Sequence, residues 1–117
     1  MLSHYVRGDV LRVDFDPAKG SEPSKVRPCV VIQNDVGNKY SPVTIVAAIT
    51  DAANVPKSYP VDVPVSKSEG GLTKDSVIQC NLIRCVDQTR IQQCTGRLSD
   101  GTMRKVDAAL KISLALR

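Results

Sequence analysis

The 117-residue sequence is poor in aromatic side chains, which make up 3% of it, and it contains no tryptophan. A core without large rings has to be built from the aliphatic residues Val, Ile, Leu and Ala, and the β-branched ones among these favour strands. Hydrophobic residues reach 42%, enough for one compact core. The length is also typical of one domain. We therefore predict a single β-rich domain over residues 1–117.

Cysteine and histidine are too sparse to indicate a metal site. A structural zinc ion needs four such ligands, commonly in C-x-x-C pairs, whereas this chain has one histidine and no C-x-x-C spacing. Its four cysteines are Cys29, Cys80, Cys85 and Cys94. We expect reduced thiols of a cytoplasmic protein, with no metal and no other cofactor.

Long apolar runs are missing too. No stretch of 18 apolar residues exists and no apolar segment opens the chain, so neither a membrane span nor a signal peptide is expected. The formal net charge of +4 suits a polyanionic partner such as a nucleic acid. Many domains that bind no nucleic acid carry a similar charge, so charge alone leaves both readings open.

Short strands account for most of the remaining pattern. Apolar residues alternate over 9–15, which predicts a half-buried strand, and residues 16–28 follow as a long polar loop. The run 29–33 predicts a strand buried on both faces, and 35–42 a turn. Further strands are expected in the segments 43–50, 61–65, 76–80, 82–86 and 90–95. Pro60 and Pro64 make 61–65 an edge strand, because proline cannot donate to a ladder.

The C-terminal segment has helical periodicity. Ser99 or Asp100 can cap a helix over 102–116, which contains neither proline nor glycine. One apolar stripe comprises Met103, Val106, Leu110 and Leu114, and a second comprises Ala109, Ile112 and Leu116. One side can pack on the barrel, and the other is either sunk in the same core or available to a second subunit. The elements together predict a small, strongly bent β-barrel with a C-terminal helix.

Four segments, in order, resemble the MazF/PemK family of toxins. They are RGDVLRVDFDPAKGSEPSKVRPCVVIQND (7–35), VTIVAAIT (43–50), KDSVIQCNLIRCVDQTR (74–90) and GRLSDGTMRKVDAALKISLAL (96–116). The resemblance implies an SH3-like barrel, of the type shared with the gyrase poison CcdB, and a homodimer. It implies a metal-independent endoribonuclease that cuts single-stranded RNA to 2′,3′-cyclic phosphate and 5′-hydroxyl ends and so inhibits translation and growth. It also implies a MazE-like antitoxin whose acidic tail covers the RNA groove.

The resemblance places catalytic residues at Arg27 and Thr50, and Glu22, in the same loop as Arg27, is a third candidate that is otherwise a surface carboxylate. A guanidinium matches phosphate oxygens and can hold the charge that grows in the transition state. The hydroxyl of Thr50 can donate to the phosphate or relay a proton to the leaving oxygen. Glu22, five residues before Arg27, can accept the 2′-hydroxyl proton or orient the guanidinium. With only His4 available, a mechanism using two histidines is excluded.

Base recognition is expected from polar groups, because few aromatic side chains are available for stacking. The RNA-binding residues that the resemblance suggests are Lys19, Ser21, Asn34 and Ser76. Asn81 and Leu82 depart from the family pattern, which often has an acid followed by glutamine there, so the cleaved sequence cannot be taken from a relative.

Two alternatives share the predicted fold. A CcdB-like gyrase poison acts through a C-terminal Trp-Gly-Ile, whereas this sequence has no tryptophan and ends in Leu-Ala-Leu-Arg. A barrel that binds RNA or protein without cutting is the other alternative, and the presence of both Arg27 and Thr50 disfavours it.

Overall fold

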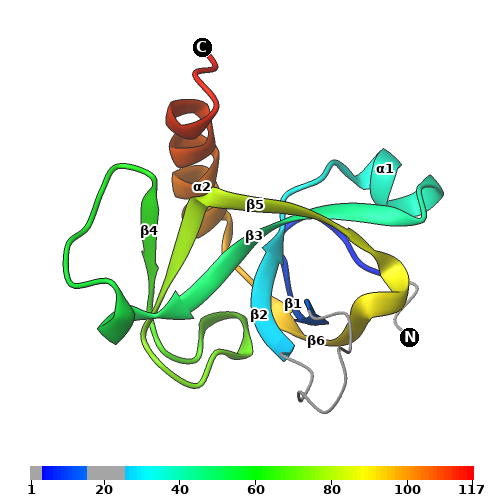
Figure 1. Ribbon diagram of the computed structural model, residues 1–117, viewed down its shortest axis with the longest axis horizontal. Helices are drawn as coiled ribbons and strands as arrows, with labels where there is room; N and C mark the ends of the chain where they lie inside the picture. The colour runs from blue at the N-terminus through cyan, green and yellow to red at the C-terminus, as the bar shows by residue number, and fades with distance from the viewer. Residues whose placement is uncertain (1–3, 16–25) are drawn as a thin grey trace.

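A computed structural model describes residues 4–15 and 26–117 of the chain. Its strands are β1 (Asp9–Asp14), β2 (Val26–Val31), β3 (Val43–Asp51), β4 (Asp62–Val65), β5 (Ser76–Asp87) and β6 (Ile91–Arg97). Two α-helices, α1 (Asp35–Tyr40) and α2 (Asp100–Ser113), and three 3₁₀ turns, η1 (Ala52–Asn54), η2 (Glu69–Gly71) and η3 (Gln88–Arg90), connect or follow them. Figure 1 shows α2 standing beside β5 and β4.

The six strands form one antiparallel sheet in the order β4-β5-β3-β2-β1-β6. This order leaves β4 and β6 as the two edge strands of the sheet. The turn η2, which follows β4 in the chain, packs against β6 and β1. There the Thr95 hydroxyl donates to the carbonyl of Gly70 at 2.8 Å. The sheet is therefore barrel-like, as predicted, with a 3₁₀ turn in place of the last ladder.

Two glycines allow this close contact. A Cβ added to Gly71 would lie 2.3 Å from the carbonyl oxygen of Thr95, and Gly71 has a φ of +76°, which other residues rarely adopt. A Cβ on Gly96 would lie 2.7 Å from the carbonyl carbon of Gly70. Side chains at either position would separate η2 from β6.

Aliphatic side chains fill both faces of the bent sheet. Cys29, Val30 and Val31 are fully buried, which confirms the prediction of a strand buried on both sides. Val30 belongs to a cluster that includes Val106 and Leu110 of α2, while Cys29 and Val31 belong to a second cluster with Leu11.

All four cysteines are free thiols. Burial raises the pKa of the Cys29 thiol to about 12 and that of the Cys80 thiol to about 11.

Several sequence predictions were wrong at their boundaries. Strand β2 begins at Val26, inside the predicted loop, because Val26 and Arg27 pair with Asp14 and Val13 of β1. The predicted turn at 35–42 contains the helix α1, which Asn34 caps. The segments 76–80 and 82–86 are one strand, but it is bent at Asn81 as expected, because Ala47 and Ala48 pair with Ile83 and Gln79. The intervening residues form a bulge.

Helix α2 begins after Ser99, whose side chain accepts from the backbone N–H of Thr102, and ends at Ser113 rather than Leu116. Val106, Ala109 and Leu110 face the sheet, whereas Ile112, Leu114 and Leu116 are exposed. A salt bridge of 2.7 Å from Arg7 to Asp107 also ties the helix to the N-terminal segment. Within the described parts of the chain, no helix has the length and apolarity needed to cross a membrane.

Candidate active site

Arg27 and Thr50 lie on neighbouring strands of the sheet. Strands β2 and β3 pair from Val31 and Val46 as far as Cys29 and Ala48. Arg27 and Thr50 therefore lie at the same end of the two strands, each two residues beyond the last pair. Arg27 is exposed and Thr50 is partly exposed, so both side chains can reach a ligand.

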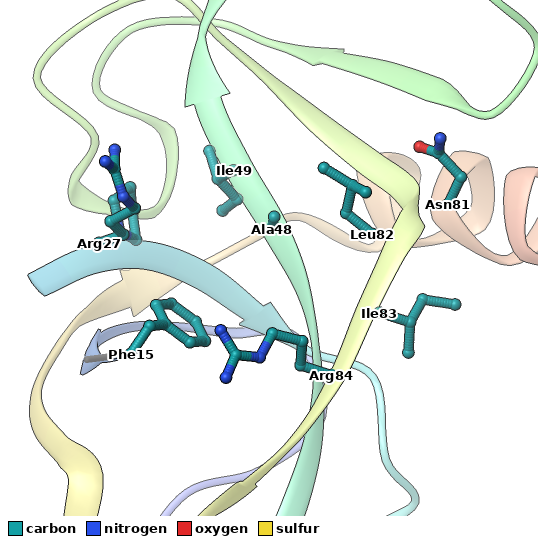
Figure 2. Close-up of a pocket in the computed structure, with 9 residues that line it drawn as sticks. Phe15, Arg27, Ala48, Ile49, Asn81, Leu82, Ile83 and Arg84 are labelled. Atoms are coloured by element: carbon teal, nitrogen blue, oxygen red, sulfur yellow. The ribbon is translucent and has the colours of Figure 1, made fainter. Parts of the chain in front are cut away.

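Arg27 lines a hollow of about 490 Å³, which we call the Arg27 hollow. Its walls come from β1, β2, β3 and β5, and its lining residues are Phe15, Arg27, Pro28, Ala48, Ile49, Asn81, Leu82, Ile83 and Arg84. Figure 2 shows Arg27 and Leu82 on either side of β3. Among the residues that the structure describes, the lining carries two guanidinium groups and no carboxylate, which suits a phosphate-bearing ligand.

Phe15 and Arg84 form a stacked pair in this hollow. The Arg84 guanidinium carbon lies 4.8 Å from the centre of the Phe15 ring, and Figure 2 shows the two groups side by side. Such a cation–π contact orients the arginine. Sequence reasoning missed Arg84, because only the fold brings the end of β1 and the middle of β5 together.

Thr50 lines an adjoining hollow, which we call the Thr50 hollow. It shares Pro28 with the Arg27 hollow, and its lining residues are Arg12, Pro28, Thr50, Asp51, Gly71, Leu72, Thr73, Lys74, Ser76 and Thr95. Arg12 and Lys74 add positive charge, although Lys74 lies 3.4 Å from the carboxylate of Asp51. Hydrogen bonding from the Ala53 backbone, and then the nearby Lys74, lower the pKa of Asp51. Asp51 is therefore an ionised acceptor.

The Thr50 hydroxyl already has one partner. The side-chain amide of Asn54 donates to its oxygen at 3.2 Å. Because the oxygen accepts that bond, the hydroxyl hydrogen stays available for donation to a ligand. The bond also ties η1, and the loop that follows it, to the strand that carries Thr50.

Of the other predicted site residues that the structure describes, Ser76 lines one of the two hollows and Asn34 lines neither. Ser76 lies in the Thr50 hollow, where it is almost buried and its hydroxyl donates to the Lys74 carbonyl at 2.8 Å. Asn34 lies beyond the opposite end of β2 from Arg27, and its side chain accepts from the Gly37 N–H. The structure thus brings Ser76 near Thr50 and does not bring Asn34 to either hollow. Glu22, Lys19 and Ser21 lie outside the described residues.

Acidic and thiol side chains do not gather in a metal-binding arrangement in the described chain. Among residues 4–15 and 26–117, no group of three or more His, Cys, Asp or Glu side chains could hold an ion together. Cys85 and Cys94 are exposed but separate strands carry them. Among the described residues, the polar side chains that line the two hollows are the guanidinium groups of Arg12, Arg27 and Arg84, the Lys74 ammonium, the Asn81 amide, several hydroxyls and the Asp51 carboxylate.

Comparison with known proteins shows the family of this chain. Residues 6–114 match the family model described as PemK-like, MazF-like toxin of type II toxin-antitoxin system, and the chain belongs to that family. A relative from Staphylococcus epidermidis, named Endoribonuclease MazF, is 51% identical over 110 residues, which are 94% of this chain and 91% of the relative.

Solved structures share the fold at low identity. An endoribonuclease from Mycobacterial species, in complex with its cognate antitoxin, has a TM-score of 0.80 and 19% identity over 97% of this chain and 98% of that one. A MazE-MazF structure from Deinococcus radiodurans has a TM-score of 0.79 and 19% identity, with 97% of both chains covered. These likenesses confirm the predicted barrel-like fold with its C-terminal helix.

Proposed function

We propose that this chain is an endoribonuclease toxin of a type II toxin–antitoxin system, and that it cuts single-stranded RNA where the Arg27 and Thr50 hollows meet. The observation that carries the proposal is that Arg27 and Thr50 lie at the same end of the adjacent strands β2 and β3 and line two hollows that share Pro28. The relative named Endoribonuclease MazF supports the activity. We further propose that residues 1–117 act as one toxin domain in the cytoplasm.

The reaction is a transfer within the RNA. The 2′-oxygen bonds to the adjacent phosphorus as its proton leaves, and the bond from phosphorus to the 5′-oxygen breaks as that oxygen gains a proton. The products are a 2′,3′-cyclic phosphate and a 5′-hydroxyl. Negative charge builds on the phosphoryl oxygens in between, and a preorganised cation at that point lowers the barrier.

Arg27 supplies that cation. Its planar fork can bind two phosphoryl oxygens at once, and a guanidinium keeps its proton at ordinary pH, so we assign it electrostatic stabilisation rather than proton transfer. Thr50 donates its free hydroxyl hydrogen to the phosphate or to the leaving oxygen. Glu22 remains our candidate to accept the 2′-hydroxyl proton or to orient Arg27.

Binding of the RNA uses positive charge and polar groups around this pair. Arg84 and Lys74 line the two hollows on either side of Pro28. Ser76, in the Thr50 hollow, is the described residue best placed for base contacts, while Lys19, Ser21 and Asn34 stay predictions. A MazE-like antitoxin with an acidic tail would compete for the same charges, and the solved neighbours include such toxin–antitoxin complexes.

Cleavage should not depend on a divalent cation, because the groups assigned to the reaction need none. Purified protein incubated with a long RNA should produce the same fragments with EDTA as with Mg²⁺, at rates within about twofold. Primer extension maps the new 5′ ends. If these ends carry hydroxyls, an adaptor should be ligated to them only after a kinase has added a 5′-phosphate. Activity that EDTA removes and Mg²⁺ restores would contradict this mechanism.

We also propose that the chain forms a homodimer through the exposed end of α2. Ile112, Leu114 and Leu116 are 58%, 53% and 60% exposed, and Leu114 and Leu116 line an apolar hollow with Ile45. Contiguous exposed apolar surface of this kind is typical of a protein interface.

Deleting residues 112–117 should therefore weaken dimerisation by at least about tenfold, given about 25 cal/mol for each Å² of apolar area lost. Sedimentation velocity over a concentration series measures the dissociation constant. Val36→Ser is the matched control, because Val36 is 71% exposed on α1, away from this surface. A truncated chain that dimerises like the native one would show that the interface lies elsewhere.

A further inference from the structure

A third hollow adjoins the Arg27 hollow at the bulge of β5, where Asn81 lines both. It lies between the loop after η1, the start of β4 and the end of α2, with a volume of about 750 Å³. Lys57 and Tyr59 lie on its loop side, and we call it the Tyr59 hollow. This loop falls within residues 51–73, the part of the sequence that least resembles the toxin family.

Two asparagines connect the Tyr59 hollow to the reaction site. Asn81 lines both this hollow and the Arg27 hollow, because the bulge turns it outward between them. Asn54 lines the Tyr59 hollow and donates to the Thr50 hydroxyl. A ligand extending from the reaction site in this direction would therefore reach Tyr59 without leaving the surface groove.

Tyr59 is held in an exposed position with a lysine at its ring. Its backbone N–H donates to the Asp62 carboxylate at 2.9 Å, and its carbonyl accepts from the Asp62 N–H at 2.9 Å. Pro60 follows it and restricts the backbone further. The ring is 56% exposed, and the ammonium nitrogen of Lys57 lies 5.7 Å from its centre. A fixed, exposed ring beside a cation matches a nucleotide, which has a flat base and a charged phosphate.

We propose that Tyr59 stacks on an unpaired base flanking the cleaved linkage, while Lys57 binds a neighbouring phosphate. This inference rests on the proposed function and adds a subsite that sequence reasoning missed, since it expected recognition without stacking. A surface for a second protein is the competing use of the same hollow, because Ile112, which we assign to the dimer surface, also lines it. RNA is favoured because the hollow is continuous with a phosphate-binding site and a lysine lies at the ring.

The test compares Tyr59→Ala with Tyr59→Phe on RNAs cut to different lengths around a mapped cleavage position. For a long RNA, Tyr59→Ala should lower kcat/KM by about 10- to 100-fold, the loss of one base stack, while kcat at saturating RNA changes less than about twofold. Tyr59→Phe should keep the native value. Shortening one flank should slow the native protein by the same factor but leave Tyr59→Ala unaffected.

Tyr40→Ala is the matched control. Tyr40 is 74% exposed on α1 and also has a lysine beside its ring, Lys39 at 5.2 Å, but it lines none of the three hollows. The Tyr40→Ala variant should cleave RNA like the native protein.

The role of Lys57 is tested by measuring how tightly Lys57→Ala binds an RNA that has a 2′-deoxy nucleotide at the cleavage position and therefore cannot be cut. The slope of log affinity against log salt should fall by about 0.7, the value for one phosphate contact on a single strand.

Three outcomes would overturn the subsite. The first is a native kcat/KM for Tyr59→Ala. The second is that shortening either flank of the RNA slows the native protein and Tyr59→Ala equally. The third is that Tyr59→Ala no longer sediments as a dimer, which would make the hollow a protein interface. Each differs from failure of the proposed function. In that case the native protein would cut no RNA, or Arg27→Ala would cut as well as native.

Discussion

Replacing Arg27 with alanine is expected to lower the rate of RNA cleavage by about 10³-fold at saturating RNA, the effect of removing a guanidinium that stabilises transition-state charge. Arg27→Lys should recover only part of the rate, because an ammonium cannot bind two phosphoryl oxygens in a planar fork. Single-turnover cleavage of a labelled RNA measures both variants. The reactions contain EDTA, so that any contaminating metal-dependent nuclease is inhibited, and the products are quantified on gels.

The fold should survive this change. Arg27 is exposed and its side chain fills no core position, so the melting temperature of Arg27→Ala should stay within about 2 °C of native. Arg104→Ala, an exposed arginine on α2, serves as the control for loss of positive charge alone and should cleave at nearly the native rate. Cleavage by Arg27→Ala at the native rate would reject Arg27 as the catalytic cation and leave a barrel that cuts by other groups.

Much of the fold could be predicted because the spacing of apolar residues along a segment, and the composition of that segment, depend only on residues that are close in the sequence. The alternation over 9–15, the apolar run from Cys29 and the Ser99 cap each depend on residues that are neighbours in the chain. The errors fall where long-range pairing decides. Val26 and Arg27 read as loop in a polar segment, yet pairing with β1 makes them a strand.

The candidate site could be proposed from the sequence only through resemblance. A lone arginine in a polar segment and a threonine at a strand end carry no chemical signature of their own. Their positions at the same end of β2 and β3, and the bulge at Asn81 between the Arg27 and Tyr59 hollows, arise only when the sheet forms. Arg84 and Tyr59 could not have been singled out, because nothing near them in sequence marks them as neighbours of Arg27 or Asn81.

The same long-range closure that builds the site also makes it sensitive to one glycine. Gly71 lies in η2, where the chain crosses from β4 toward β5 and touches β6, and it lines the Thr50 hollow. Its contact with Thr95 takes the place of a strand ladder between the two sheet edges. Anything that lengthens this contact opens the barrel beside Thr50.

Gly71→Ala is therefore expected to destabilise the protein by about 3 kcal/mol, from about 1–2 kcal/mol for a positive φ and the rest from overpacking against backbone. The added Cβ would lie 2.3 Å from the Thr95 carbonyl oxygen, an atom that cannot rotate away as a side chain can. The melting temperature should fall by about 10 °C, measured by calorimetry or circular dichroism. Cleavage at low temperature should also fall, because the Thr50 hollow widens.

Gly101→Ala provides the contrast. Gly101 lies in the first turn of α2, where an added Cβ would come no closer than 3.8 Å to any atom beyond its immediate surroundings. That variant should be neutral or stabilised by about 0.5–1 kcal/mol, because alanine restricts the unfolded chain and favours helix. If Gly71→Ala unfolded at the same temperature as Gly101→Ala, the contact between η2 and β6 would not close the barrel. The two sheet edges would then be held by their separate packing against the core.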